Sequence, residues 1–306
     1  MTQPRFDPVA LGQVQRNYGP VVEDPSSDPG TAGIDTLLDT RYSNEPRYTI
    51  LPSPEQFATL DLEGVERVWR DRYGDAGDFV FAFAGDFDMD ELIDLAASYI
   101  GALPGDGTVE QWVDVEDPPP AGVVRQEVLA GTGDTSSLTL LFTSPVAPVD
   151  GALRANTDVV TEVLTTRLTN VIREELGESY SPTSFSFINS DPDPLVQTYM
   201  RITGSPKRIE SVADLVVAEL DDLATNGPTD SEFDGAFAQV QETYQFVSND
   251  SFLEELINDA IFPDRELQDY FDQFSALDGV TSDTVRQYIA DHVGTQQFIQ
   301  VAVLPR

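Results

Sequence analysis

Apolar residues between positions 164 and 176 recur at the spacing of one helical face. The stripe consists of Leu164, Leu168, Val171, Ile172 and Leu176. This period predicts a helix with one buried side, and Gly177 suits its end because glycine has no Cβ. Arg173 lies in the last predicted turn and Tyr180 lies just beyond it. Both can face the same cleft, although the spacing alone favours a core helix with a solvated arginine.

Helical periodicity also predicts helices in both halves of the chain. They cover residues 6–18, 34–38, 65–74, 90–100, 207–223, 230–249, 252–261, 265–277 and 282–292. Asp88 and Glu91 have the spacing of a capping box at the start of the fourth helix. The alternating aspartates here do not make a calcium loop, because that loop needs glycine at the position of Glu91 and glutamate at Ala97.

Strand-length apolar or alternating runs predict seven strands. They cover residues 47–51, 79–84, 123–129, 138–144, 184–188, 196–203 and 298–304. The run 79–84, FVFAFA, has no polar interruption and predicts a strand buried on both faces. A stretch rich in proline, glycine and acidic residues at 106–122 predicts a linker.

Four blocks of residues recur in the same order in the two halves, which predicts an internal repeat. The blocks pair Phe6-Asp7 with Phe233-Asp234, Gln56-Phe57 with Gln273-Phe274, Val65 and Gly74 with Val285 and Gly294, and Phe79-Val80 with Phe298-Ile299. We therefore expect an α+β fold with two homologous domains, each with helices packed against a mostly antiparallel sheet. The first domain, residues 1–105, is expected to be incomplete at its start, and residues 123–306 to be complete.

Charge and composition exclude several classes of function. The chain has 54 acidic and 17 basic residues and a net charge of −37. Such a surface repels nucleic acid and anionic lipid, and it attracts basic peptides or serves as a solubilising surface in a salty habitat. No apolar run is long enough to span a bilayer. We expect a soluble protein and leave its compartment, periplasmic or otherwise extracytoplasmic or cytoplasmic, open.

The histidine and cysteine counts restrict the chemistry further. The chain contains no cysteine and a single histidine, His292. A multi-histidine metal site cannot form within one such chain, and a Ser-His-Asp relay would have to use His292. At the end of a predicted helix, His292 is more simply a cation that complements the helix dipole. The sequence predicts no metal site and no catalytic residue.

Several stretches together resemble the pitrilysin/insulinase family of zinc metallopeptidases. They are residues 56–61 with the helix after them, FVFAFAGDFDMDEL to YIGALP at 79–104, LTTRLTNVIREELGESYS at 164–181 and the terminal FIQVAVLP. The resemblance covers about residues 30–306. It implies four homologous α+β domains in two halves that close on a peptide. This chain matches the non-catalytic C-terminal half, with the third domain truncated at its start and the fourth complete.

The resemblance implies that zinc binds to the other half of the enzyme. The family's motif, His-x-x-Glu-His, needs two histidines, and this chain has one. We therefore expect no cofactor in this chain, zinc in an N-terminal catalytic half that is its partner, and no activity of the chain alone. A catalytically inert binding or scaffold subunit with the same fold is the alternative.

The resemblance also assigns substrate contacts to Arg173 and Tyr180. In such enzymes an arginine and a tyrosine at these motif positions reach a peptide substrate beside the metal. A guanidinium can bind peptide carbonyl groups, and a phenol can donate to a developing oxyanion. A helix-end arginine paired with Glu174 or Glu178 is the structural alternative. We further expect residues 79–84 to expose an apolar face that drives self-association.

Overall fold

The computed structural model describes residues 4–43, 45–77, 79–81, 83, 85–105, 113, 117–176, 181–189, 193–246 and 267–306. Its centre is a five-stranded sheet with the strand order β1-β5-β2-β4-β3. The strands are β1 (Val123–Leu129), β2 (Ser136–Pro145), β3 (Ser181–Asn189), β4 (Leu195–Gly204) and β5 (Phe298–Leu304). Strands β1 and β5 run parallel, and the other neighbours are antiparallel. The α+β fold with a mostly antiparallel sheet is therefore confirmed.

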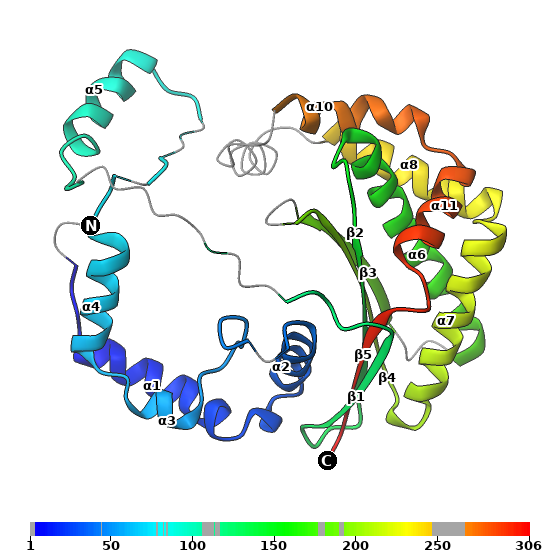
Figure 1. Ribbon diagram of the computed structural model, residues 1–306, viewed down its shortest axis with the longest axis horizontal. Helices are drawn as coiled ribbons and strands as arrows, with labels where there is room; N and C mark the ends of the chain where they lie inside the picture. Colours follow the sequence, from blue (N-terminus) through cyan, green and yellow to red (C-terminus); the bar gives the residue numbers. More distant parts are fainter. Residues whose placement is uncertain are drawn as a thin grey trace.

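One face of the sheet carries a layer of helices (Figure 1). The layer consists of α6 (Gly151–Leu176), α7 (Ile209–Asn226), α8 (Asp230–Phe246), α10 (Leu267–Ala276) and α11 (Ser282–His292). Because side chains alternate along a strand, every second residue of β2 points into this layer. Leu138, Leu140 and Phe142 are buried there against Leu164 and Leu168 of α6. Leu164, Leu168 and Ile172 of the predicted apolar stripe thus form the buried side of α6, Val171 is half-buried, and the side chain of Leu176 lies outside what the structure describes.

The opposite face of the sheet is covered in part by α2 (Pro29–Arg41). Ala32 and Leu37 of this helix pack with Ile299, Val301 and Val303 of β5. A Cβ atom on Gly33 would lie 2.8 Å from Cγ2 of Val303, so glycine permits this close approach. Helix α2 therefore joins the N-terminal part of the chain to the sheet.

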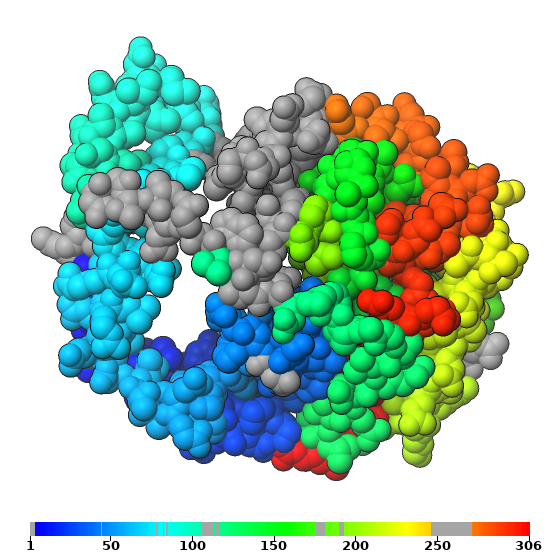
Figure 2. Space-filling view, in the orientation of Figure 1, coloured from blue at the N-terminus to red at the C-terminus, as the bar shows by residue number. Residues whose placement is uncertain are grey.

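The remaining N-terminal helices extend beyond α2 (Figure 1). They are α1 (Pro8–Glu23), α3 (Pro54–Ala58), α4 (Leu62–Tyr73) and α5 (Met89–Tyr99). Aspartate or serine caps each of them, as Asp61 does by accepting a hydrogen bond from the backbone of Gly64. Figure 2 shows an opening between these helices and the half of the molecule that contains the sheet.

Two strand predictions for the N-terminal part are wrong. Residues 47–51 form turns and bends, and the described residues of 79–84 form no strand. Val80, Phe81 and Phe83 are 62%, 40% and 50% exposed rather than buried. A strand needs backbone partners, and no described strand pairs with this segment, whereas β5 has a neighbour on each side. The predicted helix 252–261 and most of the linker 106–122 lie outside the described residues.

Truncation of the buried stripe tests the packing of α6. Leu164 is fully buried, so Leu164→Ala should lower the free energy of unfolding by about 2–5 kcal/mol through lost burial and a cavity. Asn170 is exposed on the same helix, and Asn170→Ala should change it by less than about 0.5 kcal/mol. Urea denaturation measures both changes. Equal effects of the two substitutions would contradict this packing.

The exposed apolar segment around Phe81 predicts self-association of the chain. Burial of these side chains between copies would remove apolar surface from water. Light scattering over a range of concentrations should show oligomers, and the double substitution Val80→Lys with Phe83→Lys should shift them toward monomers. A wild-type chain that stays monomeric at high concentration would exclude this association.

Candidate functional site

Helix α6 carries the first of the two predicted substrate residues at its end. Arg173 lies in the last turn, where a cation is favourable to the helix dipole, and it is exposed. It forms no ion pair with any residue that the structure describes, and Glu174 beside it is also exposed. Arg173 therefore does not pair with Glu174, whereas a pairing with Glu178, which lies outside the described residues, stays an alternative.

The second predicted residue, Tyr180, lies outside the described residues, as does Glu178. Strand β3 begins directly after it, at Ser181, and forms one edge of the sheet. The pairing of Arg173 with Tyr180 on one ligand stays a prediction.

A buried arginine fixes α6 to the two helices beside it. Arg167 is 8% exposed, and its Nη2 donates to Glu232 Oε2 of α8 at 2.9 Å. Its Nη1 donates to Glu219 at 3.0 Å and to Asp222 at 2.8 Å, both on α7. The hydrogen bond with Glu232 is the largest cause of the raised pKa of Arg167. The three carboxylates thus hold α6 in one position through a single cation.

The same contacts favour the ionised forms of Glu232 and Asp222. Burial is the largest single influence on Glu232 and raises its pKa, but hydrogen bonds from Arg167 and Thr229 outweigh it, so the pKa lies below its ordinary value. The hydrogen bond from Arg167 is also the main cause that lowers the pKa of Asp222. Both groups bind fewer protons in the folded chain than in the unfolded chain.

Three aromatic rings form a cluster on the sheet face opposite α6. Phe185 stacks on Tyr199 with 5.0 Å between the ring centroids and 10° between the ring planes. Phe187 meets both rings edge-on, at 5.6 Å from Phe185 and 6.0 Å from Tyr199. Phe185 and Phe187 are 38% and 52% exposed, and burial raises the pKa of Tyr199. Mutual contact of the rings gives a preformed apolar surface open to solvent.

Beside this cluster lies a cavity of about 220 Å³, here called the α2 groove. It is lined by Pro29, Gly30, Gly33, Ile34, Leu37 and Leu38 of α2 and by Ser137, Thr139, Phe185, Tyr199, Arg201 and Val303 of the sheet. Arg201 is the only charged residue among them, and it is exposed.

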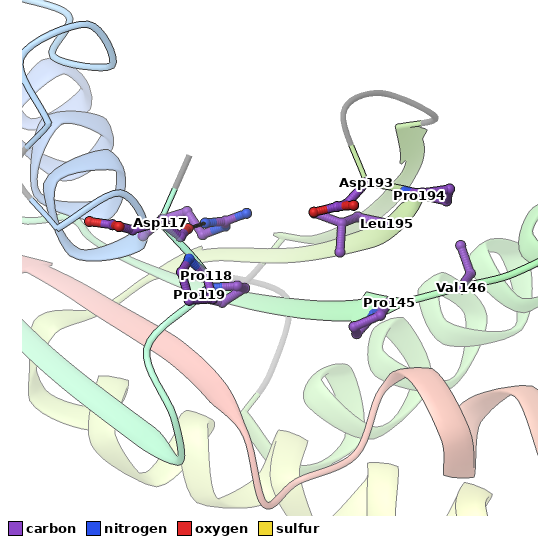
Figure 3. A pocket seen from close by; sticks show the side chains of 9 residues that line it. Asp117, Pro118, Pro119, Pro145, Val146, Asp193, Pro194 and Leu195 are labelled. Atoms are coloured by element: carbon purple, nitrogen blue, oxygen red, sulfur yellow. Dashed lines mark hydrogen bonds between the residues drawn. The ribbon is translucent and has the colours of Figure 1, made fainter. Parts of the chain in front are cut away.

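A second cavity, of about 340 Å³, is here called the proline pocket. Asp117, Pro118 and Pro119 line one side of it, and Asp193, Pro194 and Leu195 line the other (Figure 3). Arg41 is buried at its wall and donates from Nη1 to the carbonyl oxygen of Asp117 at 3.2 Å. Because proline has no backbone N–H group, these walls offer acceptors and apolar surface but few donors.

The described residues of this chain offer no site that fits a catalytic zinc ion. No group of three or more His, Cys, Asp or Glu residues that could hold a metal occurs in the described part of the chain. The single histidine, His292, lies with Nδ1 2.9 Å from Oγ of Ser144. Burial lowers the pKa of His292, so the imidazole is mainly neutral near pH 7. His292 lies in the last turn of α11, as predicted, but burial favours its neutral form over the cation.

The arrangement of helices on a five-stranded sheet has relatives. A family model described as the peptidase M16 inactive domain matches residues 59–240, more than half of the chain. The chain belongs to this family. The resemblance to pitrilysin/insulinase peptidases, and to their inactive part, is thereby confirmed. A comparison with curated protein sequences gives no significant match.

Solved structures share the fold of this M16 chain. The periplasmic protease PqqL from Escherichia coli is 16% identical, with a TM-score of 0.77 and coverage of 97% of this chain and 33% of PqqL. An M16 inactive domain from Pseudomonas fluorescens is 19% identical, with a TM-score of 0.78 and coverage of 99% and 72%. A mutant of the ferredoxin protease FusC, in complex with Arabidopsis ferredoxin, is 16% identical, with a TM-score of 0.75 and coverage of 100% and 33%.

The solved structures of PqqL and FusC are much longer than this M16 chain. The chain spans about a third of the length of PqqL and of FusC. Among the helices that the structure describes, none has the length and apolar character needed to cross a bilayer.

Sequence reasoning found Arg173 but neither of the two cavities. Both cavities combine residues far apart in the chain, such as Ile34 with Tyr199 or Asp117 with Asp193. One signal was available. The alternation Ser-Phe-Ser-Phe at residues 184–187 places both phenylalanines on one face of a strand.

The ion pairs of Arg167 predict a specific pH dependence of stability. The ordinary pKa values are 4.5 for Glu232 and 3.8 for Asp222, and both are lowered in the folded chain. Their contribution is therefore present above these values and is lost as the pH falls below them. Arg167→Met should cost about 3 kcal/mol or more at pH 7, because it leaves carboxylates unpaired, and less at about pH 3.

Urea denaturation at the two pH values measures this difference. Arg208→Met, at an exposed arginine that precedes α7, is the matched control and should have little effect at either pH. A loss for Arg167→Met that is as large at acidic pH as at neutral pH would contradict the electrostatic role of Arg167.

Proposed function

We propose that this chain is the non-catalytic, substrate-enclosing part of a zinc metallopeptidase that acts on peptides. The observation that carries the proposal is Arg173, an exposed guanidinium without a described ion-pair partner at the end of a helix whose other side is buried. In a chain with a net charge of −37, an exposed cation that forms no ion pair with a described carboxylate is a candidate to bind a ligand.

The contacts that hold α6 in place reduce the entropic cost for Arg173 to bind a ligand. Arg167 and the buried stripe hold α6 against α7, α8 and the sheet. A side chain on a rigid helix loses less conformational entropy on binding than one on a mobile loop. In this proposal the guanidinium of Arg173 binds carbonyl oxygens of an extended peptide, and the phenol of Tyr180 donates a hydrogen bond to the same ligand.

The metal belongs to another part of the enzyme in this proposal. With one histidine and no cysteine, the present residues do not hold zinc, so zinc and the catalytic residues are assigned to an N-terminal half that is the partner of this chain. The ferredoxin in the FusC structure supports a polypeptide as the class of ligand.

Substitutions in the enzyme that contains both halves test the proposal. Arg173→Ala and Tyr180→Phe should each lower kcat/KM for a peptide by about tenfold to hundredfold, because each removes a charged or polar contact to the reacting peptide. Zinc content, measured by atomic absorption, should stay unchanged. Arg208→Ala, at an exposed arginine elsewhere on the chain, is the control and should keep wild-type turnover.

Two other outcomes would decide against parts of the proposal. Wild-type turnover in both variants would remove Arg173 and Tyr180 from the substrate site. Peptide binding without any cleavage or zinc in the two-half protein would favour the inert binding or scaffold subunit.

A further inference from the structure

Arg201 lies among uncharged neighbours on the open face of the sheet. Its cross-strand partners are Thr139 on β2 and Thr183 on β3. Along its own strand the residues on the same face are Tyr199 and Thr203, two positions away on either side. None of these four neighbours is a carboxylate.

The residues that line the α2 groove surround Arg201 with uncharged side chains in the same way. Every residue that lines it other than Arg201 is uncharged, and Arg201 forms no ion pair with a residue that the structure describes. The whole chain has 54 acidic and only 17 basic residues. An exposed guanidinium that forms no ion pair with a described residue is therefore a local positive site on an acidic protein, complementary to an anion.

The rest of the groove is suited to an apolar side chain. Leu37 and Val303 lie at the packed contact of α2 with the sheet, and the stacked rings of Phe185 and Tyr199 form the adjoining wall. The volume of about 220 Å³ is below the roughly 300–1,000 Å³ of sites for drug-sized ligands and cofactors. This size fits one large side chain of a peptide.

We propose that the α2 groove binds an extended peptide segment in which a bulky apolar residue stands next to a carboxylate. The apolar side chain enters the groove against Phe185 and Leu37, and the carboxylate accepts hydrogen bonds from the guanidinium of Arg201. A basic residue at that place would meet Arg201 as a like charge. This inference rests on the proposed function, because it names the class of peptide that the enclosing part prefers.

Carboxylates that lie farther from Arg201 than the Debye length do not cancel this preference at moderate salt. At about 0.15 M ionic strength the Debye length is about 8 Å, so charges farther away are largely screened. Binding should therefore be measured near this ionic strength.

Direct binding to the 306-residue chain tests the inference. The probe is a fluorescein-labelled octapeptide, Gly-Ser-Thr-Phe-Glu-Thr-Ser-Gly, measured by fluorescence anisotropy. Replacement of its glutamate by glutamine should weaken binding about tenfold, and lysine should weaken it further. Replacement of its phenylalanine by alanine should also cost about tenfold, because the groove then stays partly empty.

Substitutions in the chain complete the test. Arg201→Gln should remove the preference for glutamate over glutamine, and Arg201→Glu should reverse the preference so that the lysine peptide binds best. Lys207→Glu makes the same change of charge at an exposed residue that does not line the groove, and it should keep the wild-type order. Circular dichroism on each variant checks that the fold is kept.

The inference is overturned if the wild-type chain binds the glutamate and lysine peptides equally, if Arg201→Gln keeps the preference, or if no probe binds at about 1 mM. If Arg173→Ala lowers turnover but no probe binds, the peptide preference of the α2 groove is wrong and the proposed function stands. If the probes bind in the expected order but Arg173→Ala and Tyr180→Phe keep wild-type turnover, the peptide preference of the α2 groove stands. The proposed substrate role of Arg173 and Tyr180 is then wrong.

Discussion

Backbone pairing of β5 is the constraint on which the rest of the structure depends. This strand, from the C-terminal end of the chain, lies between β1 and β2 and pairs with both. Its alternate side chains enter both hydrophobic clusters, with Phe298 and Ala302 on the α6 side and Val301 and Val303 on the α2 side. Without β5, neither helix layer would have a continuous surface to pack on, and β1 would have no described partner.

The same requirement explains where sequence patterns succeeded and where they failed. The strands of the sheet and the buried stripe of α6 could be predicted because their periods match their burial. Residues 79–84 have an equally strong apolar pattern and begin with the same Phe-Val/Ile pair as β5, yet the described part forms no strand. An apolar sequence pattern indicates a preference for burial. The backbone N–H and C=O groups of a strand also need hydrogen-bond partners, and a neighbouring strand that is distant in sequence must provide them.

The candidate site was predictable to a similar degree. Arg173 followed from a motif resemblance and its exposure from a helical period, because both depend on residues close in sequence. The contacts of Arg167 with α7 and α8, and the surroundings of Arg201, depend on how distant elements meet. The abundance of acidic residues also hid which carboxylates would form specific pairs, because almost any arginine had a candidate partner nearby in sequence.

The absence of a side chain at Gly33 has a consequence beyond packing. Because a Cβ atom there would come within 2.8 Å of Val303, the distance between α2 and the sheet depends on this one position. Gly33 and Val303 also line the groove. The lack of a side chain at Gly33 therefore keeps α2 close to the sheet and so influences the width of the groove. Any larger residue at this point of the helix would push α2 away from the sheet and change the width of the recess, while the strands stay in register.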